Sequence, residues 1–167
     1  MSTSKLALPV QKVHTFLWFE KDGILAAKFY TTLFAQSPSA VKNNSADRSF
    51  IKSESGVVVS FQLEGQDYSI LNGGTHYKLT PAVSLFITCE DQEEVDYFWN
   101  ALLEDGGSTM QCGWLTDKFG VSWQVVPKVL MELIGHEDSV KAKRAHAAML
   151  DCVKLDVQKL QDAFDGK

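Results

Sequence analysis

The stretch AVSLFITCEDQEEVDYFWNALLEDGG, residues 82–107, places a strand, a helix start, an amphipathic helix and a helix end in succession. Its first part, 82–89, is short and apolar, and we predict a strand buried on both faces. Asp91 with Glu94 three residues later resembles a capping box. Gly106-Gly107 is typical of a helix end. Between them lies an apolar stripe at i, i+3, i+4 and i+7, formed by Val95, Phe98, Trp99 and Leu102.

The same succession occurs earlier in the chain. Residues 13–19 (VHTFLWF) again predict a strand buried on both faces, and Asp22 stands at the expected helix N-cap. A second apolar stripe follows, formed by Ala26, Phe29, Tyr30 and Leu33. Each of these helix positions lies 69 residues before its counterpart, and the strands match at a separation of 70. Repetition of strand, cap, stripe and turn in order indicates two similar modules.

Further strand-like runs follow each predicted helix, and the chain ends in helical patterns. The runs are a weak one at 39–42, then 56–63 and 68–71 around Gly65, and 111–115 and 121–126 around a turn at 117–120. The terminal helical patterns cover 129–134, 140–150 and 156–164. We therefore predict an α+β fold: a single domain, 1–167, with two βαβββ modules (12–74 and 82–127) and C-terminal helices in 128–167.

The composition excludes several classes of function. The chain has 167 residues and a net charge of −5, without a basic stripe, which argues against nucleic acid and anionic membrane surfaces as partners. The basic residues near the end predict a solvated helical face. Three widely spaced cysteines form no disulfide framework. Residues 1–11 show no secretory h-region, and no apolar run is long enough to span a membrane. We therefore expect a cytoplasmic protein with free thiols.

Several segments resemble the PhnB-like family of the vicinal oxygen chelate superfamily, which includes glyoxalases, bleomycin resistance proteins and dioxygenases. They are TFLWF (15–19), FY (29–30), LNGG (71–74), CEDQEEVD (89–96), CGWLTDKFGVSWQVVP (112–127) and AMLDCVKLD (148–156). The resemblance covers nearly the whole chain from Lys12, and 112–127 is its most specific part. It implies paired βαβββ units whose curled sheets enclose a cleft, and a homodimer. Many members are labelled 3-demethylubiquinone-9 3-methyltransferase.

The resemblance also implies where a metal would lie. Enzymes of the superfamily hold one divalent metal through His, Glu or Gln, two from each module, and the metal stabilises a developing enolate or activates dioxygen. The corresponding positions here are His14, Ser69, Ser84 and Gln124. Only His14 is a strong ligand and no carboxylate is present, so we predict a degenerate site with no cofactor. A divalent metal held through His14 remains the alternative.

Alternation along the strands predicts the walls of the cleft. His14, Phe16 and Trp18 share one strand face, and Ser84 and Phe86 share the equivalent face of the second module. An apolar pocket with a few polar groups is the general form of a small-molecule site. We therefore expect a small, partly apolar ligand. The candidate catalytic residues are His14 and Gln124, and the candidate ligand contacts are Phe16, Trp18, Ser69, Ser84 and Phe86.

Two other functions stay open. One is a metal-dependent lyase, isomerase or dioxygenase that uses His14 and Gln124. The other is a non-catalytic dimeric interaction module, in which the aromatic residues serve as core. Methyl transfer is disfavoured, because no glycine-rich turn joins a strand to a helix in a parallel pattern.

Four further positions receive structural interpretations. We read Cys112 as a small buried residue at a strand start rather than a nucleophile, and Asp117 with Lys118 as turn formers. Trp123, which points opposite to Gln124, is assigned to the helix-packed core.

Overall fold

The structure is a computed structural model that describes residues 11–167, so the prediction about a leader lies largely outside the described residues. The first sheet consists of β1 (Thr15–Phe19), β2 (Phe50–Glu54), β3 (Val58–Leu63) and β4 (Gln66–Asn72), in the order β1-β4-β3-β2. The second consists of β5 (Leu85–Cys89), β6 (Ser108–Thr109), β7 (Trp114–Thr116) and β8 (Ser122–Pro127), in the order β5-β8-β7-β6. In each sheet the first strand pairs in parallel with the last, and the other pairs are antiparallel. The predicted α+β class is confirmed.

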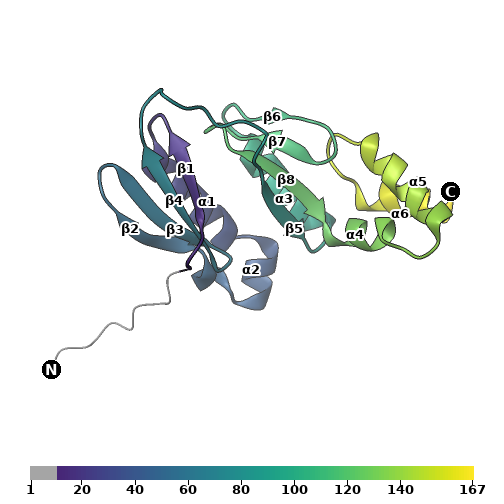
Figure 1. Cartoon of the computed structure of the whole chain (residues 1–167). Coiled ribbons are helices and arrows are strands. Elements are labelled where there is room, and N and C mark those ends of the chain that lie inside the picture. Colours follow the sequence, from purple (N-terminus) through teal and green to yellow (C-terminus); the bar gives the residue numbers. More distant parts are fainter. Residues whose placement is uncertain (1–10) are drawn as a thin grey trace.

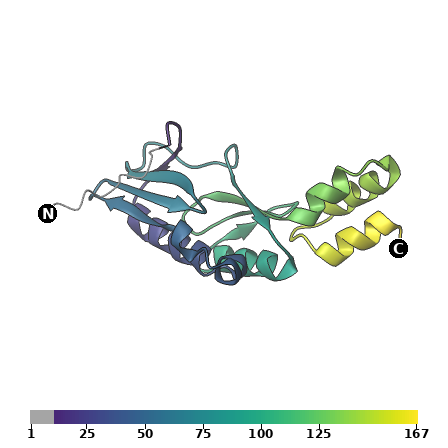
Figure 2. The same cartoon turned by 90° about the horizontal axis from the view of Figure 1, so that it is seen from below.

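The helices cover one side of both sheets (Figures 1 and 2). Helix α1 (Gly23–Ala35) lies beneath the first sheet and α3 (Gln92–Leu103) beneath the second. Buried side chains from both modules form one cluster between sheets and helices. The Tyr30 and Trp123 rings, for example, meet with centroids 5.2 Å apart. The two modules therefore share one core within the chain, and Trp123 lies in it at 1% exposure, as predicted.

The opposite side of each sheet is open, and here the prediction of strands buried on both faces was wrong. Phe16 and Phe86 are 56% and 51% exposed, whereas their neighbours Leu17 and Ile87 are buried. Apolar composition alone cannot tell whether a second layer covers a strand. In the part of the chain that the structure describes, helices cover one face only.

The segment after α1 also differs from the prediction. Residues predicted as a weak strand at 39–42 belong to α2 (Pro38–Asn43). The Ser37 side chain accepts a hydrogen bond from the Ala40 backbone N–H, and proline stands at the first helical turn, where its missing N–H costs nothing. A 3₁₀ turn, η1 (Ala46–Arg48), then leads into β2, a strand that the sequence patterns missed.

Three C-terminal helices form a separate unit at one end of the molecule (Figure 1). They are α4 (Lys128–Ile134), α5 (Ser139–Leu150) and α6 (Val157–Asp165), as the periodicity predicts. They enclose their own buried cluster, which includes Leu130, Ala145 and Leu160. The segment between α5 and α6 ties this unit to the second module: Lys154 pairs with Asp96 at 2.5 Å, and the Gln92 side-chain N–H donates to the Leu155 carbonyl at 3.3 Å.

Candidate functional site

The open face of the first sheet carries a chain of polar side chains. His14 lies just before β1, and its Nε2 is 3.3 Å from Ser69 Oγ on β4. Ser69 is buried, and its Oγ is 2.9 Å from Ser60 Oγ on β3. This arrangement follows from the registers, in which Phe16 pairs with Ser69 and Ser60 pairs with Ser69 across the neighbouring strand. His14, Ser69 and Ser60 thus form a relay of side chains within hydrogen-bonding distance of one another. One nitrogen of the exposed imidazole faces Ser69, so the other can donate or accept a hydrogen bond at the surface.

The second sheet carries the corresponding pair. Gln124 on β8 donates from Nε2 to Ser84 Oγ at 2.8 Å, and Ser84 immediately precedes β5. Gln124 pairs in register with Phe86, so its amide and that ring stand on the same open face. The structure thus brings together His14 with Ser69, and Gln124 with Ser84. Each pair lies within its own sheet.

The predicted aromatic walls are only partly assembled. Three hollows touch predicted contact residues: one of about 180 Å³ includes Ser84, one of about 260 Å³ includes Trp18, and one of about 600 Å³ includes Phe86. The first two share Lys78 and Leu79 in their walls, whereas the hollow beside Phe86 shares no lining residue with either. The continuous cleft predicted from the sequence is therefore not formed by these hollows.

Trp18 is fixed in place by the Asn-Gly-Gly turn. Its indole N–H donates to the Gly74 carbonyl at 2.9 Å, and its ring forms an edge-to-face contact with Tyr77. A Cβ on Gly73 would come within 2.3 Å of the indole, so only glycine fits beneath the ring. Gly74 has φ +80°, a conformation that glycine adopts without strain. The Asn-Gly-Gly turn therefore also holds the half-buried Trp18 side chain in position.

The donor set does not fit a catalytic metal. Catalytic sites generally need about three good ligands, and the four mapped positions offer one imidazole, one amide and two hydroxyls. Ser69 already lies within hydrogen-bonding distance of His14, and Ser84 already accepts a hydrogen bond from Gln124. Within residues 11–167, no three His, Cys, Asp or Glu side chains gather as metal ligands. His76, His136 and His146 are exposed.

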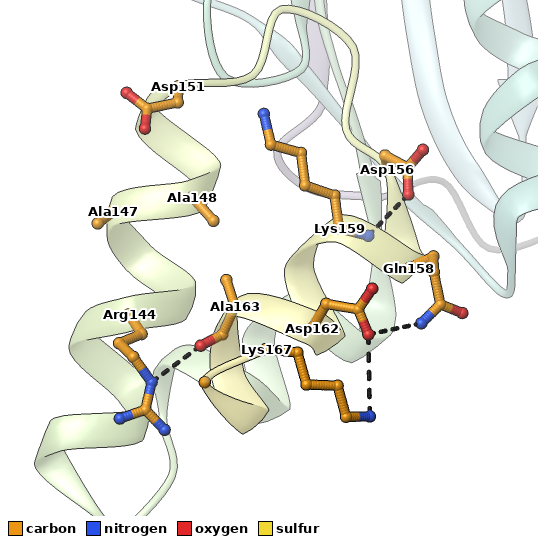
Figure 3. Close-up of a pocket in the computed structure, with 11 residues that line it drawn as sticks. Arg144, Ala147, Ala148, Asp151, Asp156, Gln158, Lys159, Asp162, Ala163 and Lys167 are labelled. Atoms are coloured by element: carbon orange, nitrogen blue, oxygen red, sulfur yellow. Dashed lines mark hydrogen bonds and ion pairs between the residues drawn. The ribbon is translucent and has the colours of Figure 1, made fainter.

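A larger hollow, about 820 Å³, lies away from this face, between α5 and α6 (Figure 3). Its polar groups mainly hold α6 in place. Arg144 donates to the Ala163 carbonyl at 2.9 Å, and the Asp156 carboxylate accepts from the Lys159 backbone N–H at 2.8 Å. We therefore do not assign the functional site to this groove.

Asp117 forms a buried polar centre beneath the second sheet. Its Oδ2 accepts from Tyr30 Oη at 2.7 Å and from Trp123 Nε1 at 2.8 Å, and its Oδ1 accepts from the Phe119 and Val121 backbone N–H groups. Burial raises the pKa of Asp117, and these hydrogen bonds only partly offset it. Burial and the Asp117 charge likewise raise the pKa of Tyr30, which keeps its hydroxyl protonated as a donor. Asp117 is therefore a turn former, as predicted, and also links the two modules.

Comparison with known proteins identifies the family. The sequence profile described as 3-demethylubiquinone-9 3-methyltransferase matches residues 11–126. The chain belongs to this family. A solved member, a putative 3-demethylubiquinone-9 3-methyltransferase (PhnB protein) from Bacillus cereus, is 33% identical, with a TM-score of 0.57, over 70% of this chain and 99% of that one. The predicted resemblance to PhnB-like proteins of the glyoxalase fold is confirmed.

More distant structures share the fold alone. A Pseudomonas aeruginosa protein is 16% identical, with a TM-score of 0.50, over 71% of this chain and 98% of its own. The fosfomycin resistance protein FosX from Listeria monocytogenes, solved with Mn(II) and sulfate, is 14% identical with a TM-score of 0.50; the match covers 81% of this chain and 99% of that one. No protein of curated function matches significantly. In the described residues, no helix has both the length and the apolarity needed to cross a bilayer.

Two features of this family member were missed by sequence reasoning. Ser60 belongs to the His14–Ser69 relay, and its position opposite Ser69 would have followed from a correct β3–β4 register. The segment Lys154–Asp156 has three separate structural roles. Lys154 pairs with Asp96, Leu155 is fully buried, and Asp156 caps α6.

Proposed function

We propose that this PhnB-like protein binds a small, partly apolar molecule on the open faces of its two sheets, with His14 and Gln124 as the polar contacts. One observation carries the proposal. Equivalent positions of the two modules hold preformed polar pairs, His14 with Ser69 and Gln124 with Ser84, beside exposed aromatic rings. Small-molecule sites are typically lined by apolar and aromatic side chains with a few polar groups that orient the ligand.

The side chains favour a neutral or weakly anionic ligand with a flat apolar part. Phe16 and Phe86 offer exposed ring faces, and Trp18 adds a half-buried indole. The imidazole of His14 and the amide of Gln124 can each donate to a ligand oxygen. His14 is also the side chain suited to general acid or base chemistry if a reaction takes place.

The experiment is a thermal-shift screen of small metabolites on the parent chain, followed by binding to His14→Ala and Gln124→Ala. Loss of one hydrogen bond should weaken binding by about 0.5–1.5 kcal/mol, or up to about tenfold. His146→Ala and Gln158→Ala, two exposed positions on the C-terminal helices, are matched controls that should bind as the parent does. Unchanged affinity in both site variants would show that the open faces are not the site.

We further propose that a second copy of the chain covers the open faces, so that two copies together form the cleft. The single chain leaves two large rings, Phe16 and Phe86, more than half exposed on faces without a covering layer. Large apolar side chains that stay exposed on a sheet face can mark an interaction site in soluble proteins. Light scattering should give twice the monomer mass, and Phe86→Asp should shift it toward monomer. Val140→Asp, at an exposed position of α5, should leave it unchanged.

The proposed ligand binding differs from the methyl transfer that the family's description names. The strand–helix turns at 20–22 and 90–91 contain no glycine, unlike the glycine-rich turn that binds dinucleotide-like cofactors. We expect no saturable binding of S-adenosylmethionine at micromolar concentration by calorimetry. Saturable binding would restore the methyltransferase hypothesis without affecting the test of His14 and Gln124.

A further inference from the structure

Two cysteines that are 40 positions apart in the sequence lie side by side in the fold. The Cys112 backbone N–H donates to the Cys152 carbonyl at 2.7 Å, and the Gly113 N–H donates to the Val153 carbonyl at 2.8 Å. With standard bond lengths, a hydrogen bond of this kind leaves the two cysteine Cα atoms at most about 6.6 Å apart. Disulfides span Cα separations of roughly 4.4–6.8 Å, so the backbones already stand within bridging distance.

The two thiols differ in exposure in a way that suits stepwise oxidation. The prediction that Cys112 is buried at a strand start was wrong, because β7 begins only at Trp114. Cys112 is half-buried in the turn between β6 and β7, at a φ of +61° that is unusual for a residue with a side chain. Cys152 is buried, at 4% exposure, between α5 and α6. A dissolved oxidant therefore reaches Cys112 first, and Cys152 is the neighbouring thiol that can resolve the product.

We infer that Cys112 and Cys152 form an oxidation-sensitive pair that closes to a disulfide. With hydrogen peroxide as oxidant, the Cys112 thiolate attacks one peroxide oxygen and the O–O bond breaks, giving a sulfenic acid and hydroxide, which takes up a proton as water. The Cys152 sulfur then attacks the Cys112 sulfur, the S–O bond breaks, and a second water leaves. The two thiols lose two electrons and two protons in all, and the peroxide is reduced to two waters.

The bond would fasten the C-terminal helices to the second sheet. The turn that contains Cys112 connects β6 to β7, and Cys152 begins the segment that docks against α3. In the reducing cytoplasm we expect for this chain, the pair stays open, and it closes under oxidising conditions. A reversible bond here controls how firmly residues 128–167 are held to the rest of the fold.

Cys89 provides a matched control. It lies in β5, is fully buried, and burial raises its pKa well above the ordinary thiol value, so it remains a thiol. The test treats the reduced full-length chain with graded hydrogen peroxide, then alkylates under denaturing conditions and records the intact mass. We expect a monomer lighter by two hydrogen atoms with one alkylated thiol, Cys89, and a crosslinked peptide pair containing Cys112 and Cys152.

Cys89→Ser should still form the crosslink, whereas Cys112→Ser and Cys152→Ala should not. The crosslinked parent should melt about 5 °C or more above the reduced form, and dithiothreitol should reverse the shift. A crosslink through Cys89, a Cys112 dimer between chains, or oxidation of Cys112 to sulfinic acid without a crosslink would overturn the pairing. A crosslinked chain with an unchanged melting temperature would overturn the fastening role. The readout on the parent chain stands even if a variant fails to fold.

Discussion

The two modules have the same strand order but begin their helices differently. In the second module Asp91 caps α3, because its side chain accepts from the Glu94 backbone N–H at 3.0 Å. In the first, Asp22 stands at the equivalent position with φ 65° and makes no capping hydrogen bond. There the Asn72 side chain, from the end of β4, accepts from the Gly23 N–H at 2.8 Å. A repeated sequence pattern thus specifies the same helix while the tertiary structure supplies a different cap.

Each module also buries one aspartate, and the two aspartates have different partners. Asp67 in the first module accepts from Lys52 Nζ at 3.0 Å and from the Gln62 amide at 2.9 Å. Asp117 in the second accepts only from uncharged donors. Burial alone would raise the pKa of Asp67, but the hydrogen bonds from Lys52 and Gln62 outweigh it and hold the pKa below the ordinary value of 3.8. The pKa of Asp117 lies above that value.

Removing the two carboxylates should give the largest contrast. Asp117→Ala leaves a buried hydroxyl, an indole N–H and two backbone N–H groups without their acceptor, and we expect a loss of about 4 kcal/mol in unfolding free energy. Asp67→Ala leaves mainly the partly exposed Lys52 ammonium, and the loss should be about 1–2 kcal/mol. Urea unfolding measures both. Equal losses would show that the uncharged network does not link the modules as described.

Alanine substitutions at two glycines of the second module should distinguish the cost of a steric conflict from the cost of backbone strain. A Cβ on Gly113 would lie 2.8 Å from the Val125 carbonyl and 2.9 Å from Leu155, at a φ of +81°. Gly120 has φ +87° but open space around it. We expect Gly113→Ala to cost about 3 kcal/mol and Gly120→Ala about 1 kcal/mol. If thermal denaturation shows the two variants to be alike, docking of Leu155 under this turn contributes little.

The helix caps should show a smaller and asymmetric effect. Asn72→Ala and Asp91→Ala should each lower stability by about 1 kcal/mol, because each leaves a helix N-terminal N–H without its side-chain acceptor. Asp22→Ala should change stability by no more than about 0.5 kcal/mol, since Asp22 makes no such bond. A loss for Asp22→Ala as large as that for Asp91→Ala would mean that the two modules are capped alike after all.

These differences mark the limit of what the sequence predicts. The 69-residue repeat and the placement of Trp123 in the core follow from local periodicity. The open faces do not, because Phe16 and Phe86 are as apolar as buried residues and only the helix layer decides their exposure. The strand register would predict that His14 lies near Ser69. The approach of Cys112 to Cys152 depends instead on how the C-terminal helices dock.

The smallest expected effect is the pH dependence of the two carboxylates. Asp67, with its pKa lowered on folding, contributes stability at neutral pH that is lost as the pH falls below about 4. Asp117, with its pKa raised, binds its proton more tightly in the folded state, so its contribution falls as the pH rises above about 4. The stability difference between parent and Asp67→Asn should therefore grow with rising pH, and that for Asp117→Asn should shrink. Unfolding curves across the acidic range would show the two slopes, and slopes of the same sign would contradict the assignment.

The contact between Trp18 and the Asn-Gly-Gly turn has an optical consequence. Its indole is half-buried beside the open face of the first sheet, whereas Trp123 is enclosed with Asp117 in the core. Indole emission shifts to shorter wavelength when water is excluded from the ring. Occupation of the open face, by a ligand or by a second copy, would therefore change the emission of Trp18 and leave that of Trp123 unaltered. The molecule thus carries its own fluorescent reporter for the surface whose role is proposed above.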